Sequence, residues 1–240
     1  MRRLTPLIRR ARSQGGFSLP ELLVAMMIGL ATLLAVFGVL DVSVKQSNAI
    51  AGRVNATQRA RIAMDQITRQ LRSQVCYSTD IHALTDARDD SVTFHVDLSD
   101  GTRLIERREI AFSTVTKKIT ERTWAGVANT GAGLPILFPT LTRTRVLADD
   151  IVRAPVLERP PNAPLFRYYR YDTSIPPRPV IQLTTPLSAD DLKLVAKIDI
   201  GFTSLPPASR TTPSASVTLY NEIYVRAANP NDPVPKPICA

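Results

Sequence analysis

The chain has 240 residues, enough for one membrane-anchored helix and one further domain of ordinary size. Its net charge of +9 falls to +4 beyond residue 16, because five of the 30 basic residues and none of the 21 acidic ones lie in residues 1–16. An excess this small excludes an argument for nucleic-acid binding from charge alone.

Residues 1–16 contain five arginines but no acidic residue and no apolar stretch of the kind a signal peptide has. A secretory signal peptide carries about 7 to 15 apolar residues before its cleavage site, whereas the apolar run here follows the Gly16–Phe17 junction. We therefore interpret residues 1–16 as a leader outside the fold. Because basic residues beside a membrane span stay in the cytoplasm, we expect residues 41–240 to lie on the other side of the membrane, outside the cytoplasm.

Residues 17–40 are predicted to form a single transmembrane helix. The 19 residues from Leu22 to Leu40 contain no charge and only one hydroxyl, that of Thr32. A helix of this length spans about 28 Å, close to the roughly 30 Å hydrocarbon core of a bilayer. Glu21 lies at the edge of this helix, where a carboxylate that enters the bilayer is expected to have a partner.

The N-terminus combines an arginine-rich leader, a Gly-Phe junction, a glutamate at the fifth position after the junction and an apolar helix. This combination resembles the N-terminus of a type IV prepilin or type II secretion pseudopilin, and the resemblance covers residues 1–75. It implies that a prepilin peptidase cleaves between Gly16 and Phe17, and that Phe17 is N-methylated. It also implies that Glu21 pairs with the N-terminal amine of a neighbouring subunit during filament assembly.

The resemblance implies a structural subunit, not an enzyme, without a cofactor. Such a subunit crosses the cytoplasmic (inner) membrane once, in contact with membrane lipid. Its N-terminus is cytoplasmic and its globular domain lies outside. An inner-membrane assembly platform would join it to other pilin or pseudopilin subunits in a periplasmic or cell-surface filament. The length and loops of the globular part look more like a minor pilin (PilW-like) or a J-type pseudopilin than a major subunit.

Several alternatives stay open at this point. The filament could be a type IV pilus, a competence fibre or a type II secretion pseudopilus. The chain could instead act as a tip adhesin or DNA-uptake minor pilin that binds a ligand through its loops, since loops carry recognition. An ordinary membrane protein with an extracytoplasmic enzyme domain has the least support from the residues.

Pro20 departs from the aliphatic residue that is common at this position in the family. Inside a helix, proline removes a hydrogen bond and costs about 3 kcal/mol. The first four N–H groups of a helix, however, have no partner within it. If the mature chain starts at Phe17, Pro20 is its fourth residue and loses no hydrogen bond. The sequence therefore favours the cleaved chain over the uncleaved one.

Residues 41–75 are predicted to continue the helix as an amphipathic segment. Its apolar residues recur mostly three or four positions apart, at Ile50, Val54, Met64, Ile67, Leu71 and Val75. Surface pairs at i, i+4 spacing are expected among Arg61, Asp65 and Arg69. A basic patch is interpreted as solvated surface and subunit contacts; it comprises Arg53, Arg59, Arg61, Arg69 and Arg72. The absence of aromatic residues for base stacking in this segment argues against nucleic acid as a partner.

Residues 76–228 are predicted to form a β-rich globular domain. Alternating apolar and polar residues predict three antiparallel strands, at Ser91–Leu98, Thr102–Phe112 and Val115–Trp124, with a turn at Asp100-Gly101. Three more strands are expected at Leu165–Tyr171, Leu194–Phe202 and Ser216–Val225. Short helical turns are expected at Asp149-Asp150 and Asp190-Asp191.

The region from Pro135 to Pro237 holds 17 of the 19 prolines, which excludes long helices and favours strands joined by extended loops. Residues 229–240 are predicted to form a proline-rich C-terminal tail. The expected fold class is therefore α+β, with a long N-terminal helix packed on an antiparallel β-sheet. This arrangement matches the pilin architecture.

The two cysteines, Cys76 and Cys239, could form a disulfide in an oxidising compartment. The bridge would close a loop of about 163 residues and contribute on the order of 5 kcal/mol by chain-entropy arguments. Two unpaired buried thiols are the alternative, and the sequence does not decide between them.

No catalytic constellation and no metal site is predicted. His82 and His95 have neither a cysteine nor a second histidine at metal-ligand spacing. Asp86, Asp89 and Asp90 are candidates for calcium ligands, but their spacing does not match an EF-hand loop.

Overall fold

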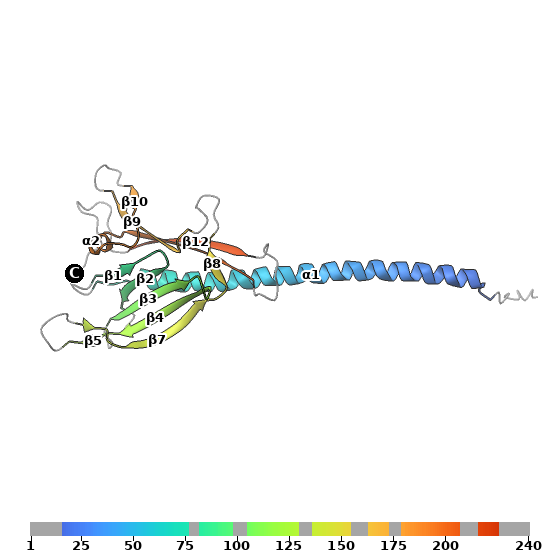
Figure 1. Ribbon diagram of the computed structural model, residues 1–240, viewed down its shortest axis with the longest axis horizontal. Helices are drawn as coiled ribbons and strands as arrows, with labels where there is room; N and C mark the ends of the chain where they lie inside the picture. The colour runs from blue at the N-terminus through green and yellow to red at the C-terminus, as the bar shows by residue number, and fades with distance from the viewer. Residues whose placement is uncertain are drawn as a thin grey trace, which may run out of the picture. The chain divides into compact units, whose positions relative to one another are not determined.

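The computed structural model describes residues 16–76, 82–97, 105–129, 136–154, 163–172, 179–206 and 216–225. The chain divides into two compact units, the first ending at Asn48 and the second beginning at Ala49. The described part of the first unit is almost entirely helical. The second unit contains the remainder of the same helix and every described strand (Figure 1).

Helix α1 is continuous from Leu19 to Arg72, a length of 54 residues. The prediction of one long helix is confirmed. Within the first unit all of its residues are exposed. Within the second unit one face is buried, with members three or four positions apart as one helical face requires: Gly52, Ala56, Ala60, Ala63, Met64, Ile67 and Leu71.

The predicted buried face of this segment was partly wrong. Ile50 and Val54 are 59% and 47% exposed, whereas the smaller residues Gly52 and Ala56 are buried. Small side chains let another segment pack close to the helix backbone. A search for large apolar side chains therefore finds the wrong face over these two turns.

The first sheet has five antiparallel strands in the order β1-β2-β3-β4-β7. Their bounds are β1 Leu84–Ala87, β2 Ser91–Val96, β3 Glu106–Ser113, β4 Lys118–Ala125 and β7 Leu141–Ala148. The predicted meander of three strands is confirmed as β2, β3 and β4. Strand β4 begins later than predicted because residues 114–117 form the turn, in which Lys117 has a φ of 54°.

A second sheet of five strands, all paired antiparallel, lies in the same unit, where one sheet was expected. Its strands are β8 Ile151–Arg153, β9 Phe166–Tyr171, β10 Val180–Gln182, β11 Lys197–Ser204 and β12 Val217–Tyr224. Their order is β10-β9-β11-β12, and β8 also pairs with β11. All eight residues of the central strand β11 are buried.

Two smaller features complete the described fold. Strands β5 (Val127–Ala128) and β6 (Ile136–Leu137) form a two-stranded sheet. Helix α2 (Ala189–Leu192) contains Asp190 and Asp191, as predicted.

The pair Asp149-Asp150 forms a bend between β7 and β8, and the prediction of a helical turn there was wrong. Asp150 has a φ of 53°, a left-handed conformation that aspartate tolerates better than most residues. Both carboxylates lie near Arg59 of α1, at 2.6 Å and 3.4 Å from its Nη1 atom. One member of the predicted basic patch is therefore neutralised within the chain.

The two large sheets and the end of α1 share one hydrophobic core. Ile67, Phe94 and Phe202, which come from α1 and the two sheets, are fully buried in it. The hydroxyl of Tyr168 in β9 lies 3.2 Å from the carbonyl oxygens of Arg88 and Ser91, so it joins the second sheet to the first. Burial raises the pKa of this phenol well above its ordinary value and keeps it a donor.

Candidate functional site

The junction between Gly16 and Phe17 lies outside the helix. Residues 16–18 have no regular secondary structure and are exposed, and the Phe17 side chain is 80% exposed. Exposed, irregular backbone is the form in which proteases preferentially cut a chain. The peptide bond that the sequence singles out is therefore accessible in the described structure.

Pro20 is the second residue of α1, which begins at Leu19. Its missing N–H belongs to the first turn, where helices leave N–H groups unpaired. The first backbone bond of this region runs from the Leu22 N–H to the Ser18 carbonyl, at 3.2 Å. Since the helix already begins at Leu19 in the full chain, Pro20 is equally well accommodated before and after cleavage.

Glu21 lies in the first turn of α1 and is exposed. A carboxylate at this end of a helix is stabilised by the partial positive charge of the free N–H groups. None of the ion pairs between described residues includes Glu21. The side chain is therefore a carboxylate at the start of an apolar helix without a cationic partner in its own described structure.

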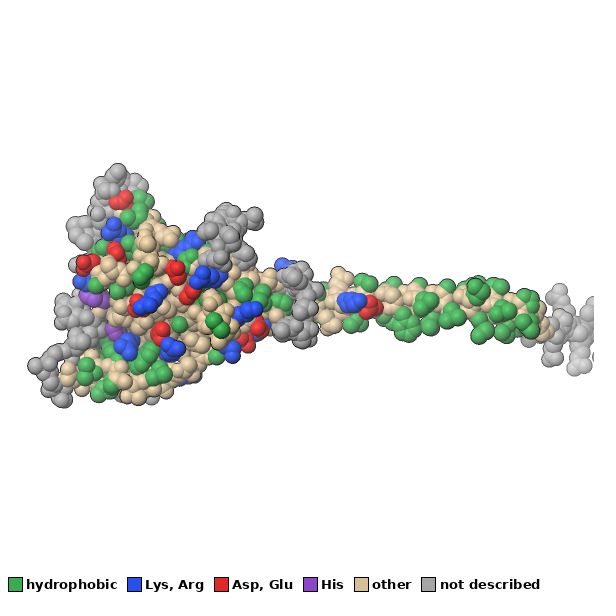
Figure 2. All heavy atoms as spheres, viewed as in Figure 1, with side chains coloured by type: hydrophobic (Ala, Val, Ile, Leu, Met, Phe, Trp, Pro, Cys, Tyr) green, Lys and Arg blue, Asp and Glu red, His purple; other side chains and the backbone are tan. Residues whose placement is uncertain are grey.

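The apolar segment after Glu21, Leu22–Leu40, has no polar side chain that lacks a hydrogen-bond partner. The Thr32 hydroxyl donates to the carbonyl oxygen of Ile28 at 2.6 Å, so it is satisfied within the helix. The next charges along the chain, Asp41 and Lys45, pair with each other at 2.7 Å. On the face shown in Figure 2, hydrophobic side chains are spread along the helix of the first unit, and α1 is long and apolar enough to cross a membrane.

Cys76 is disulfide-bonded and lies a short distance beyond the end of α1. Its expected partner, Cys239, lies outside the described residues. The alternative of a free thiol at Cys76 is thereby excluded, because the described residues contain no free cysteine.

The histidines and aspartates considered as metal ligands have other contacts. Burial lowers the pKa of His95, whose Nδ1 donates to the His82 carbonyl oxygen at 2.7 Å. Asp86 pairs with an arginine two residues away, Asp90 pairs with Arg153, and Asp89 accepts a hydrogen bond from a threonine. Among the described residues, no group of three or more potential ligands could hold a metal ion.

The family comparison bears on the same segment as the geometry. A family model described as the prokaryotic N-terminal methylation motif matches residues 11–37. The chain carries a type IV prepilin-like signal. This signal contains the end of the leader, the Gly16–Phe17 junction, Glu21 and most of the apolar helix. No curated protein matches the chain.

The prepilin-like signal and the fold agree with each other. A long N-terminal helix followed by antiparallel sheets is an α+β, pilin-like architecture, as predicted. The apolar helix near the N-terminus fits a single-pass membrane anchor. Together they support a type IV pilin-like or pseudopilin subunit.

Two features of the second unit had no signal in the sequence. One is the buried carboxylate of Glu121, which contacts three other elements. The other is a groove between α1 and β12. Each joins residues that are far apart along the chain, so no local pattern could have indicated them.

Proposed function

We propose that this chain is a minor pilin or pseudopilin subunit of a type IV pilus or type II secretion pseudopilus. In this proposal a prepilin peptidase cleaves between Gly16 and Phe17, and Phe17 is then N-methylated. The apolar helix holds the subunit in the inner membrane, with the leader in the cytoplasm and the second unit outside. An assembly platform then transfers the helix into a filament of pilin or pseudopilin subunits.

The observation that carries the proposal is the uncovered apolar surface of α1 after Glu21. Every residue of Leu22–Leu40 is exposed in the chain taken alone. Burying one large apolar side chain is worth about 1.5–3 kcal/mol, so a surface of this length is strongly unfavourable in water. It requires lipid, or the apolar surfaces of other helices, and transfer from one to the other keeps it covered throughout.

Glu21 supplies the specificity of this transfer. A carboxylate packed among apolar helices is costly unless a cation neutralises it. Cleavage creates such a cation, the amine of Phe17, which does not exist while the leader is attached. The amine of one subunit can then pair with Glu21 of its neighbour and set the axial position at which the two helices pack.

The proposal is tested with Glu21→Ala in the cells that make the protein. We expect the variant to be inserted and cleaved normally but to enter filaments poorly, because its neighbour's amine loses its partner. The measurements are N-terminal sequencing of the membrane protein and quantitation of the subunit in sheared filaments. Asp41→Ala is the matched control, because it removes an exposed carboxylate from the same helix.

Two results would contradict the proposal. Mature protein that still begins at Met1 would show that the leader is retained and no amine is made at Phe17. Normal incorporation of Glu21→Ala into filaments would show that the carboxylate does not direct assembly.

A further inference from the structure

Strand β7 forms one edge of the first sheet. It is the last strand in the order β1-β2-β3-β4-β7, and among the described strands it pairs only with β4 (Figure 1). Most of its residues are exposed, and the apolar side chains of Leu141 and Val146 are 47% and 51% exposed. This edge of the sheet is therefore accessible along most of its length.

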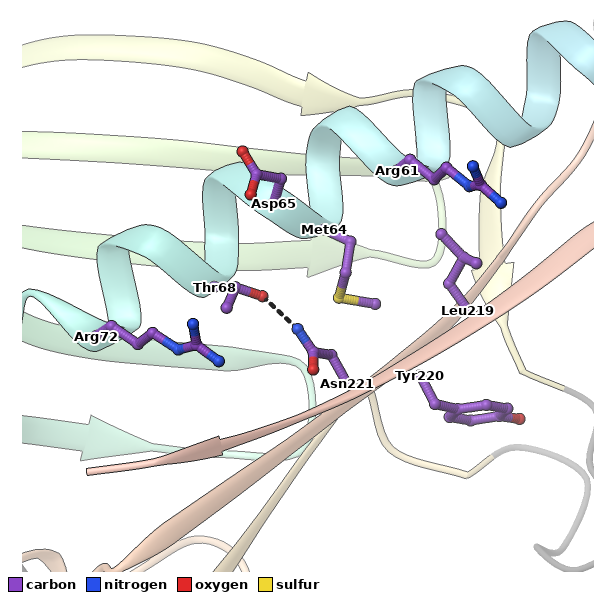
Figure 3. A pocket seen from close by; sticks show the side chains of 8 residues that line it. All are labelled: Arg61, Met64, Asp65, Thr68, Arg72, Leu219, Tyr220 and Asn221. Carbon is purple, nitrogen blue, oxygen red and sulfur yellow. Dashed lines mark hydrogen bonds between the residues drawn. The ribbon is translucent and has the colours of Figure 1, made fainter. Parts of the chain in front are cut away.

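Strand β12, at the edge of the second sheet, differs from β7 because its edge is occupied. It lies beside the groove that it forms with α1, where the Asn221 amide donates to the Thr68 hydroxyl at 2.8 Å (Figure 3). The Glu222 N–H donates to the side-chain oxygen of Asn221, and Tyr220 also has a partner. The described hydrogen bonds and ion pairs of β7, in contrast, all go to β4.

The backbone direction of β4 shows which residues of β7 face inward. In an antiparallel pair, alternate residues direct their N–H and C=O groups toward the partner strand. The N–H of Gly126, the residue after β4 and β5 begins, donates to the Ile105 carbonyl on the side of β3 at 3.1 Å. The even-numbered residues of β4 therefore face β3, whereas Glu121 and Thr123 face β7.

Thr144 and Val146 direct their backbone groups away from the sheet. Arg145 and Arg143 lie opposite Glu121 and Thr123, so the N–H and C=O groups of these two arginines face β4. The residues that alternate with them face the other way, where no described strand lies. A strand edge with outward N–H and C=O groups is a template for another extended chain.

Two irregularities limit the length of this open edge. The β4–β7 register shifts between Ile119 and Thr120 and again between Thr123 and Trp124. Four consecutive regular pairs remain between the two shifts, and they involve residues 143–146 of β7. Bulges protect a strand edge from indiscriminate pairing. An added strand is therefore expected to pair with this short window, which favours weak and reversible binding.

Charge indicates what kind of segment fits the window. Arg145 is neutralised by Glu121 within the first sheet. Arg143 is exposed and takes part in no ion pair with another described residue. The residue directly opposite Arg143 on an added strand would place its side chain on the same face, where an opposite charge is stabilising. The window therefore favours a carboxylate at that position.

A second copy of β7 is a poor occupant of the window. Two antiparallel registers overlap most of it. With Thr144 opposite Thr144, Arg143 lies opposite Arg145; with Thr144 opposite Val146, Arg145 lies opposite Arg145. Like charges directly opposite each other are destabilising. The partner strand is therefore expected to have a different sequence from β7.

We propose that the free edge of β7 binds an extended acidic segment of another protein chain, which becomes an added strand of the first sheet. The segment pairs with the outward backbone groups of Thr144 and Val146, and it carries a carboxylate opposite Arg143. Main-chain pairing of this kind supplies affinity, and the side-chain contacts supply specificity. This inference does not depend on how the N-terminal helix is used.

The test uses the full-length protein in detergent micelles and two short fluorescent peptides. Both peptides consist of alternating threonine and valine, and the central residue is either glutamate or lysine. We expect saturable binding of the glutamate peptide with a Kd between about 10 µM and 1 mM, measured by fluorescence anisotropy. The lysine peptide is expected to bind about fivefold more weakly or worse, because it places a like charge opposite Arg143.

A charge-reversal variant locates the binding to β7. Arg143→Glu should weaken binding of the glutamate peptide by about fivefold or more and reverse the preference between the two peptides. Arg61→Glu is the matched control, because Arg61 is an exposed arginine that lines the groove beside β12 instead. It makes the same change in net charge and should leave the Kd within about twofold of the parent value.

Hydrogen exchange tests whether the peptide is added as a strand. Amide protons that gain a hydrogen-bond partner exchange more slowly. We expect the glutamate peptide to slow exchange in proteolytic fragments that contain Thr144 and Val146, measured by mass spectrometry on the parent protein. Fragments from β12 should not change.

A backbone variant tests the same point by a second route. Thr144→Pro removes an N–H that faces away from β4, and proline is tolerated at such edge positions. Its control is Thr144→Ala, which keeps the N–H. We expect the proline variant to lose binding and the alanine variant to keep it. Melting temperatures of both variants show whether they remain folded, and the exchange measurement on the parent protein does not require either of them.

Any of four results would overturn the inference. They are the absence of glutamate-peptide binding up to about 1 mM, equal binding of the lysine peptide, unchanged affinity in Arg143→Glu, and unchanged hydrogen exchange in β7. Two further results would replace the proposed occupant. Self-association of the protein that Thr144→Pro abolishes would indicate a second copy, and tighter binding of a single-stranded oligothymidylate would indicate a general polyanion site.

Discussion

Glu121 is a buried carboxylate that connects α1 to the first sheet. Its side chain is 3% exposed and lies 3.1 Å from Arg108 of β3. It also accepts hydrogen bonds from Arg145 of β7 and, at 3.2 Å, from Gln70 of α1. Arg145 and the Gln70 amide thus depend on this side chain for the neutralisation or hydrogen bonding that burial requires, whereas Arg108 also pairs with Glu106 at 2.6 Å.

We expect Glu121→Ala to lower the free energy of unfolding by about 3–5 kcal/mol, because it leaves the partly buried Arg145 without its carboxylate and Arg108 with Glu106 alone. Urea denaturation of the full chain in micelles measures this change. The control is Glu109→Ala, which breaks the more exposed pair with Arg122 and should cost less than about 1 kcal/mol. If the two variants lost the same unfolding free energy, the buried contacts of Glu121 would contribute no more to stability than the exposed pair does.

His95 makes the stability of the second unit depend on pH. The ring is 4% exposed and stacks on Phe138 with centroids 5.0 Å apart. Burial lowers the pKa of His95, and this effect outweighs the hydrogen bond to the His82 carbonyl, which raises it; Arg107 lowers it further. The unfolded chain therefore binds a proton at a higher pH than the folded chain does.

Burial of the neutral His95 ring makes the protein less stable at acidic pH. The contribution of His95 to the free energy of unfolding is complete above its pKa in the unfolded chain, about 6.5. It is lost as the pH falls from there through the lower pKa that His95 has in the folded chain. We expect the unfolding free energy to fall between about pH 7.5 and pH 5.5, and to fall less in His95→Asn. Denaturant titrations of both proteins at the two pH values provide the difference. An equal decrease in the two proteins would refute the role of this histidine.

At the level of elements, the strands with a regular apolar alternation were predictable, and the others were not. Strand β2 alternates Val92, Phe94 and Val96 on its buried face, so its pattern is visible in one segment. Strands β8 and β10 have three residues each, too few for a periodicity to emerge. Strand β8 forms by pairing with β11, which comes much later in the chain, and β10 forms by pairing with the preceding strand β9.

Strand β7 illustrates a second reason for a missed prediction. It has eight residues but reads Leu-Thr-Arg-Thr-Arg-Val-Leu-Ala, and most of it is exposed. Arg145 points toward the buried Glu121, so a charged residue occupies a position where alternation would require an apolar one. Only the partner carboxylate, 24 positions earlier in the chain, explains it.

Helix α1 permits a matched test of packing within one element. Ile67 is fully buried in the core, whereas Ile62 is 57% exposed on the same helix. We expect Ile67→Ala to lower the unfolding free energy by about 2–5 kcal/mol, since it leaves a cavity. Ile62→Ala should change it by less than about 0.5 kcal/mol. The two midpoints in urea give the comparison, and coincident midpoints would contradict the assigned helix face.

At the level of the whole molecule, the N-terminal features were predictable and the groove was not. The junction, Glu21 and the apolar length lie within about 25 consecutive residues, so their order alone indicates a prepilin-like signal. The groove depends on Arg72 and Tyr220 being brought together across nearly 150 positions. No sequence pattern around Arg72 or Tyr220 predicts that the two residues lie close together in the fold.

The chain contains only two cysteines, and Cys76 is disulfide-bonded. We propose that its partner is Cys239, which would tie the end of the chain to the residues that follow α1. Cys239→Ser is then expected to lower the unfolding free energy by about 5 kcal/mol, because a loop of some 163 residues is no longer closed in the unfolded state. The measurements are denaturant midpoints and non-reducing peptide mapping. Unchanged stability, or a map that shows two free thiols, would contradict the pairing.

Every residue that is buried in the described part of the chain lies at Gly52 or beyond. The melting temperature of the second unit should therefore not depend on which apolar helix precedes it. An apolar helix of another length or composition could be grafted in front of Ala49 without loss of the domain. Mutations that tune how the subunit sits in a membrane or a filament can accumulate in the anchor independently of those that preserve the fold.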